Sequence, residues 1–300
     1  MEPLSLTLFG DVKLKRGPNG DIALPRKTQM LLAYLASDAE KRFPRNKLAS
    51  LIWVDRSEEQ ARHSLRQCLF ALAKSIGGAA TSPVVADRHQ VSLNPDIVGV
   101  DTWRFERLLA EGTPEAMRNA VALYEDDYLA GVGFEDETLD AWCAAERTRL
   151  RDRFYDTLAK LASHYADTAN LDRAIETGRR LTNLDPLRED GHRTLMRLYS
   201  RAGRRAEAIN QYRLCFETLR RELNVEPEAP TTKLFEEVRR QPETGAGQDD
   251  ISIAPSDPAT ADGSPSAFEI LASGRGSKTL VTGLGVIIGI VVVVLWLTNI

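Results

Sequence analysis

The feature that most restricts the fold of this chain is a repeat in its second half. Four apolar positions recur with a displacement of 34 residues: Leu161, Tyr165, Ala174 and Ile175 reappear as Leu195, Tyr199, Ala208 and Ile209. Small residues at fixed points of such a period let one helix cross closely over the next. The repeat therefore predicts stacked helix pairs, each of which buries one face against its neighbour.

A period of 34 residues is typical of tetratricopeptide repeats. Gly203 lies where the turn between the two helices of the second copy is expected. Two copies are fewer than the roughly three that a stable array needs. Helices predicted over residues 103–124 and 139–158 would complete the stack. A chance alignment of Leu and Ala within an ordinary helical bundle is the alternative.

The first hundred residues have a different pattern. Three short β-forming segments, at residues 4–9, 11–15 and 21–24, are separated by Gly10 and by the turn sequence GPNG, and they predict a small antiparallel sheet. Helical patterns follow over residues 26–37, 45–53 and 58–76, and then two short strands over 84–86 and 90–93. A sheet, three helices and a hairpin, in this order, indicate a winged helix.

The third of these helices, residues 58–76, has one apolar and one basic side. Its predicted buried stripe consists of Ala61, Leu65, Cys68, Leu69, Leu72 and Ile76. Its outward side carries Arg62, His63, Arg66, Gln67, Phe70 and Lys74. In isolation such a side is most often simply solvated. In a winged helix, however, the third helix enters the major groove, where Arg and Gln form paired hydrogen bonds with guanine and adenine.

Other basic residues of the same region are candidates for phosphate contacts. They are Arg88 and His89 at the tip of the hairpin, Arg26 and Lys27 at the start of the first helix, and Arg45, Asn46 and Lys47 at the start of the second. Residues 1–100 hold 14 Lys and Arg against 10 Asp and Glu, a net charge of +4, whereas the remaining 200 residues have a net charge of -8. This uneven distribution of charge suits an N-terminal region that binds a polyanion.

The last part of the chain differs from both regions. Residues 279–298 are uncharged and nearly all apolar, and a helix of this length, at about 1.5 Å per residue, spans the bilayer core. Arg275 and Lys278 precede the segment and predict that residues 1–278 lie in the cytoplasm. Residues 241–278, rich in Pro, Gly, Ser and Asp, are expected to be a disordered linker. The span would be a tail anchor or be followed by more protein.

Several ordered motifs add a family resemblance. They are LPRKTQMLLAYLA, FPRNKLASLIW, ARHSLRQCLFALAKSIG, VDTWRFERLL, WCAAERTRLRDRF and the long run from Tyr199 to Val238. Over residues 4 to 240 the chain resembles the SARP-type bacterial transcriptional regulators. That resemblance implies an OmpR-like winged helix joined to a bacterial transcriptional activator domain. It also implies double-stranded promoter DNA and RNA polymerase as partners.

The sequence thus predicts a mainly α protein with four parts: a winged-helix domain (1–99), a tetratricopeptide-like domain (100–240), a linker (241–278) and one transmembrane helix (279–298). We expect a transcriptional regulator, active as a homodimer and tethered to the bacterial inner membrane by a single span. No motif indicates a catalytic, cofactor or metal site, and the scattered Cys68, Cys143 and Cys215 fit small buried residues. The alternative is a membrane-anchored protein scaffold that does not bind DNA.

Overall fold

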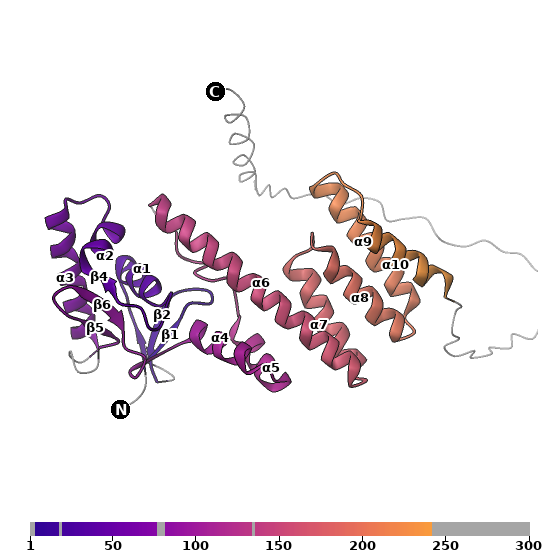
Figure 1. Cartoon of the computed structure of the whole chain (residues 1–300), viewed down its shortest axis with the longest axis horizontal. Coiled ribbons are helices and arrows are strands. Elements are labelled where there is room, and N and C mark those ends of the chain that lie inside the picture. The colour runs from indigo at the N-terminus through magenta and orange to yellow at the C-terminus, as the bar shows by residue number, and fades with distance from the viewer. Residues whose placement is uncertain (1–3, 18–19, 77–81, 134–135, 242–300) are drawn as a thin grey trace, which may run out of the picture. The chain divides into compact units, whose positions relative to one another are not determined.

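The computed structural model describes residues 4–17, 20–76, 82–133 and 136–241 (Figure 1). The chain divides into two compact units, residues 1–246 and 247–300, and the described residues belong to the first. The predicted transmembrane helix lies outside the described residues, as does the predicted linker apart from Gln241. Among the helices that are described, none is both long enough and apolar enough to cross a bilayer.

The first sheet has four strands in the order β3-β2-β1-β7. β1 (Leu4–Thr7), β2 (Lys13–Arg16) and β3 (Gly20–Ile22) pair antiparallel, as the sequence predicts. β7 (Val98–Val100) pairs parallel to β1 and was not predicted. Three residues carry too little periodicity to indicate a strand by themselves, and the partner of β7 lies more than 90 residues away in the sequence.

Three helices and a second sheet follow (Figure 1). The helices are α1 (Arg26–Leu35), α2 (Arg45–Ile52) and α3 (Glu58–Ser75), each ending one or two residues before its predicted end. The second sheet has the order β4-β6-β5, in which β4 is Phe43–Pro44. β5 (Val84–Ala86) and β6 (Gln90–Leu93) form the predicted hairpin. The element order of a winged helix is therefore present.

α3 is fixed in place at both its start and its apolar side. Ser57 and Gln60 form a reciprocal capping box at its N-terminus. The predicted stripe is buried at Ala61, Leu65, Leu72 and Ile76. Cys68 and Leu69 also pack against the core but are only half-buried. The polar Ser64 is buried instead, because Arg56 donates to its hydroxyl at 2.7 Å and that hydroxyl donates to the Gln60 carbonyl at 2.8 Å.

The single helix predicted over residues 103–124 is two helices in the structure. α4 (Asp101–Glu111) ends at Gly112, whose φ of 65° lies in the left-handed region that glycine adopts without strain. α5 (Pro114–Leu123) begins at once, because the Thr113 hydroxyl caps the N–H of Ala116 and proline suits the first helical position. The helix predicted over 139–158 is longer in the structure, where α6 runs from Glu137 to Asp167.

The repeat region consists of paired helices. α6 and α7 (Leu171–Leu184) form the first pair, and α8 (Glu189–Arg201) and α9 (Arg205–Glu222) the second, followed by α10 (Ala229–Arg240). Seven of the eight residues related by the 34-residue displacement are buried, and Ile209 is half-buried against the core. Gly203, with a φ of 72°, makes the turn between α8 and α9, as predicted.

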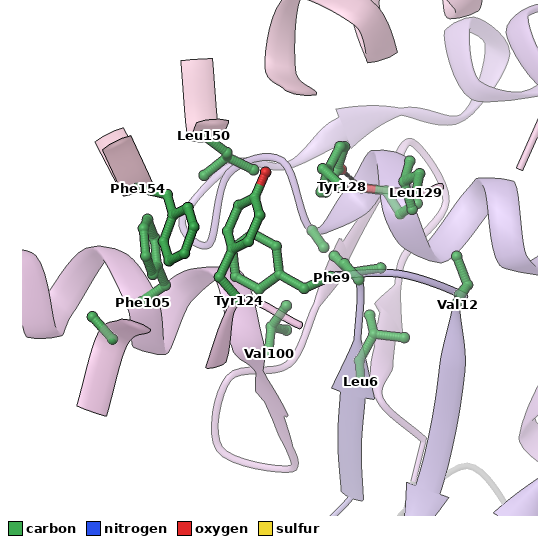
Figure 2. Packing of buried hydrophobic residues seen from close by; sticks show 14 of the residues in the cluster. Leu6, Phe9, Val12, Val100, Phe105, Tyr124, Tyr128, Leu129, Leu150 and Phe154 are labelled. Carbon is green, nitrogen blue, oxygen red and sulfur yellow. Dashed lines mark hydrogen bonds between the residues drawn. The ribbon is translucent and has the colours of Figure 1, made fainter. Parts of the chain in front are cut away.

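Aromatic side chains join the first sheet to the helices that follow it (Figure 2). The ring of Phe9, just after β1, meets Phe105 of α4 edge-on at 5.3 Å between centroids. Tyr124 stacks on Phe154 of α6 at 4.1 Å, with an angle of 6° between the rings. The indole N–H of Trp103 donates to the carbonyl oxygen of Ala36 at 2.7 Å. The winged helix and the helical region therefore share one core.

Candidate nucleic-acid interface

The twelve residues predicted to contact DNA lie on α1, α2, α3 and the β5-β6 hairpin, and six of them, from the last three of these elements, line one open groove. The groove has a volume of about 880 Å³ and is lined by the start of α2, the outward side of α3 and the tip of the β5-β6 hairpin. Its lining residues are Pro44, Arg45, Asn46, Arg62, Leu65, Arg66, Ala86, Asp87, Arg88, His89 and Gln90. We call this the basic groove.

α3 forms one wall of the basic groove. Arg62 and Arg66 are one helical turn apart, so both side chains leave the same side of the helix. Both are exposed, while Leu65 beside them is buried and anchors this side of the helix to the core. Arg62 forms an ion pair with Glu58 at 3.5 Å, but an exposed pair of this kind stabilises by well under about 1 kcal/mol. Its guanidinium can exchange this carboxylate for another anion at little cost.

The opposite wall is the hairpin, which corresponds to the wing. Its tip, Asp87, Arg88 and His89, is exposed, so the two basic side chains are accessible to a ligand. The Asp87 carboxylate accepts hydrogen bonds from the main-chain N–H groups of His89 and Gln90, each at 2.7 Å. These two bonds lower the pKa of Asp87, and the nearby side chains of His89 and Arg42 lower it by a smaller amount. The Asp87 side chain is therefore ionised at neutral pH.

The start of α2 closes the end of the groove beside the wing. The Arg45 main-chain N–H donates to the His89 carbonyl oxygen at 2.8 Å, and its guanidinium donates to the Asp87 carbonyl oxygen at 3.1 Å. Arg45 is half-buried, and its neighbour Asn46 is exposed. The sequence predicts Arg45 as a phosphate contact; the structure additionally shows it bonded to the wing.

The charge of the basic groove favours an anion. Four arginines, Arg45, Arg62, Arg66 and Arg88, line the groove together with one carboxylate, that of Asp87. Guanidinium groups bind phosphate oxygens and the edge of guanine through two parallel hydrogen bonds. The groove is open to solvent and not enclosed, so it suits an extended polyanion better than a small molecule.

The other six predicted site residues do not line the groove. On α3, His63 and Gln67 are exposed and their side chains bond to each other at 2.8 Å, and Lys74 is exposed near the C-terminal end of the helix. Lys47 is exposed on α2, and Lys27 on α1 is half-buried. Arg26 donates a hydrogen bond to the carbonyl oxygen of Gly133, in the segment before α6. All six stay predictions as DNA contacts.

An apolar groove adjoins the basic one. It has a volume of about 430 Å³, lies between the second half of α3 and the hairpin strands, and shares Ala86 with the basic groove. Phe70 projects from this part of α3 with 72% of its surface exposed, and Val85 opposite is 49% exposed. The outward direction of Phe70 was predicted from the sequence. The apolar groove was not, because it depends on the approach of α3 to the hairpin.

Sequence reasoning also missed Asp87 as part of the site. The only available signal was its place at the start of a polar turn, where aspartate commonly bonds to the main chain of the next residues. Elsewhere in the described part of the chain, no group of three or more His, Cys, Asp and Glu side chains is arranged to hold a metal ion. His192 is buried, with Nε2 at 3.0 Å from the Pro186 carbonyl oxygen and Nδ1 at 2.7 Å from the Gln211 amide nitrogen.

Comparisons with known proteins concern the helical region and the fold. Residues 100–239 match the model of the bacterial transcriptional activator domain. The fold is similar to that of Mycobacterium tuberculosis EmbR, solved in complex with a low affinity phosphopeptide, with a TM-score of 0.63 and 20% sequence identity. The similarity covers 81% of this chain but 66% of the EmbR chain, slightly less than two thirds of it. No curated protein matches the sequence. The domain match supports a transcriptional regulator rather than an enzyme, and the likeness to EmbR shows a shared fold.

Proposed function

We propose that this chain, which carries a match to the bacterial transcriptional activator domain over residues 100–239, is a sequence-specific DNA-binding regulator of transcription. The observation that carries the proposal is the basic groove. It brings Arg62 and Arg66 of α3 together with Arg88 and His89 of the hairpin, although the two pairs are more than 20 residues apart in the sequence.

In this function α3 enters the major groove of promoter DNA. Arg66, at the middle of the helix, reads a base edge, and Arg62, one turn earlier, contacts either a base or the phosphate beside it. The hairpin tip lies against the backbone, where Arg88 and His89 meet phosphates. Because the buried stripe of α3 is locked into the core, the helix presents these side chains without rearranging.

The helical region and the end of the chain supply the other partners. The activator domain contacts RNA polymerase and pairs with a second copy of the chain, so that two winged helices bind neighbouring sites on DNA. Residues 279–298 tether the regulator to the inner membrane with its DNA-binding part in the cytoplasm. Tethering confines the protein to DNA that reaches the membrane and raises its local concentration there.

DNA binding is tested with the full-length chain in detergent and a pool of random duplexes, from which bound sequences are selected. The affinity for the selected duplex should fall steeply as salt rises, because binding releases counterions from the phosphates. Arg66→Ala should weaken binding by about 1–3 kcal/mol if Arg66 reads a base. Arg118→Ala, which removes an exposed arginine from α5, is the matched control and should leave the affinity unchanged.

Binding that does not depend on salt or on Arg66 would contradict this function and favour the protein scaffold. The tether is tested separately, by fractionating bacteria that express the full chain or a chain that ends at Gln241. The full chain should be found with the membranes and the shortened chain in the soluble fraction. Equal distribution of the two would contradict the tether and leave the DNA-binding test unaffected.

A further inference from the structure

The basic groove contains one acidic residue, Asp87, at the tip of the wing. A carboxylate at this place repels the phosphates that the neighbouring arginines attract. Its pKa is lowered, so the charge persists at neutral pH. If the groove bound DNA through charge alone, Asp87 would only weaken the interaction.

The contacts of Asp87 show what the carboxylate does within the chain. One oxygen, Oδ1, accepts both the His89 and the Gln90 main-chain N–H groups at 2.7 Å. The Asp87 N–H in turn donates to the Gln90 carbonyl oxygen at 3.0 Å. Three hydrogen bonds thus close the turn, and they set the direction in which the side chains of Arg88 and His89 leave it.

Arg45 ties the same turn to α2. Its main-chain N–H and its guanidinium donate to the carbonyl oxygens of His89 and Asp87, at 2.8 and 3.1 Å. Just before it, Pro44 of β4 lies opposite Gln90 of β6 in the sheet register. The tip is therefore fixed by the hydrogen bonds that Asp87 makes within the turn and by those that Arg45 donates to it from α2.

We infer that Asp87 and Arg45 are positioning residues, which fix the wing tip so that Arg88 and His89 face the same duplex as Arg62 and Arg66. This inference rests on the proposed DNA-binding function. A tip held in one conformation loses less conformational entropy on binding than a mobile one. The gain in order offsets the repulsion between the Asp87 carboxylate and the phosphates.

Two substitutions at Asp87 distinguish its role in positioning the wing tip from the effect of its negative charge. Asp87→Asn and Asp87→Ala remove the same negative charge, but the asparagine keeps a carbonyl oxygen that can accept from His89 and Gln90. With the full-length chain and its selected duplex, we expect Asp87→Asn to bind about twofold more tightly than the unaltered chain, since a repulsive charge near phosphate is gone. We expect Asp87→Ala to bind about threefold to tenfold more weakly, since the turn loses its two internal acceptor bonds.

Asp96→Ala is the control for charge. This aspartate is exposed in the turn after β6 and does not line the groove, so the affinity should stay the same. Hydrogen exchange of the His89 and Gln90 amides gives a second readout that needs no DNA. Protection should persist in Asp87→Asn and be lost in Asp87→Ala, while thermal unfolding stays the same in both, because Asp87 is at the surface.

An Asp87→Ala chain that binds DNA as tightly as Asp87→Asn, or keeps its amide protection, would overturn the inference. If Asp87→Ala is destabilised as a whole, amide protection that falls no further at His89 and Gln90 than along α3 would equally overturn the inference. If the unaltered chain bound no duplex, the proposed function would fail. The exchange experiment would still decide whether Asp87 orders the wing.

Discussion

The carboxylate of Asp101, in the first turn of α4, accepts a hydrogen bond from the main-chain N–H of Phe9 at 2.9 Å. The same oxygen accepts the N–H of Leu8 at 2.8 Å, and the other oxygen accepts the N–H of Thr102. A single side chain thus satisfies main-chain donors at the end of β1 and at the start of the helical region. It connects the first sheet to the helical region that begins with α4.

Replacing Asp101 with alanine should lower the free energy of unfolding by about 2 kcal/mol, because the N–H groups of the buried residues Leu8 and Phe9 lose their acceptor. Urea denaturation of the substituted and unaltered chains measures this change. Asp96→Ala, an exposed aspartate in the preceding turn, should have no measurable effect. Equal stability of the Asp101→Ala chain would mean that solvent replaces the lost bonds.

Asp101 also predicts a pH dependence. Burial raises the pKa of its carboxyl group, and the N–H groups of Phe9 and Leu8 offset only part of that rise. Its contribution to the free energy of unfolding is therefore full below the unfolded pKa of about 3.9 and declines as the pH rises through the folded pKa. Asp101→Asn has no charge to bury. The free energy of unfolding of Asp101→Asn, compared with that of the unaltered chain, should therefore rise between roughly pH 3.5 and pH 7. A difference between the two chains that stays constant over this range would contradict burial of the Asp101 charge as the cause.

The stacking of Tyr124 on Phe154 predicts a large loss of stability when the Phe154 ring is removed. Phe154→Ala removes a buried ring from the shared core and should cost about 3–5 kcal/mol of unfolding free energy. Phe70→Ala makes the same chemical change on an exposed ring and should stay within about 0.5 kcal/mol. Calorimetry of both chains checks the contrast. Similar losses at the two positions would show that Phe70 is covered in solution.

The wing and α3 should differ in what they contribute to DNA binding. Arg88→Ala should weaken binding to all duplexes by a similar factor and lower the salt slope by about one, as expected for a phosphate contact. Arg66→Ala removes the same charge but should reduce the affinity for the selected duplex far more than for random DNA. Salt titrations against both duplexes measure this. An equal loss of specificity in the two variants would mean that the hairpin also reads bases.

The helix repeats leave no space for an added methyl group at Gly191. A Cβ atom built there would lie 2.6 Å from the hydroxyl oxygen of Tyr155, a buried residue of α6. Gly191→Ala should therefore destabilise the fold by about 1–3 kcal/mol. The loss should shrink when Tyr155 is also replaced by phenylalanine, which removes the clashing oxygen. A double-mutant cycle measures the coupling, and additive effects would exclude this contact as the cause.

The three cysteines should react slowly in the folded chain. Burial raises the pKa of the thiols of Cys68 and Cys143, and that of Cys215 to about 12. The thiolate, which is the reactive form, is therefore scarce at neutral pH. Alkylation at pH 8 should be slow in the native chain and rapid in denaturant. A single fast phase in native buffer would identify an accessible thiol, for which half-buried Cys68 is the first candidate.

The parts of this fold that sequence predicts well are those encoded by neighbouring residues. The Ser57 cap, the apolar spacing from Ala61 to Ile76 and the hairpin strands depend on a period or a local bond within one element. The 34-residue repeat could be predicted for a similar reason, because each helix pair packs mainly on the pair next to it in the sequence. In the candidate site, the outward direction of Arg62, Arg66 and Phe70 follows from the same periodicity.

The sequence by itself determined which side of α3 is basic and that a turn at Gly203 joins two repeated helices. Only the tertiary structure decided that β7 joins β1, that Arg26 bonds to Gly133, and that Arg45 holds the tip on which Arg88 lies. These contacts join segments between about 40 and 110 residues apart, and no local period records which distant main-chain group a side chain will meet. A guanidinium can donate to a phosphate or to a carbonyl oxygen, and packing places one of these within its reach.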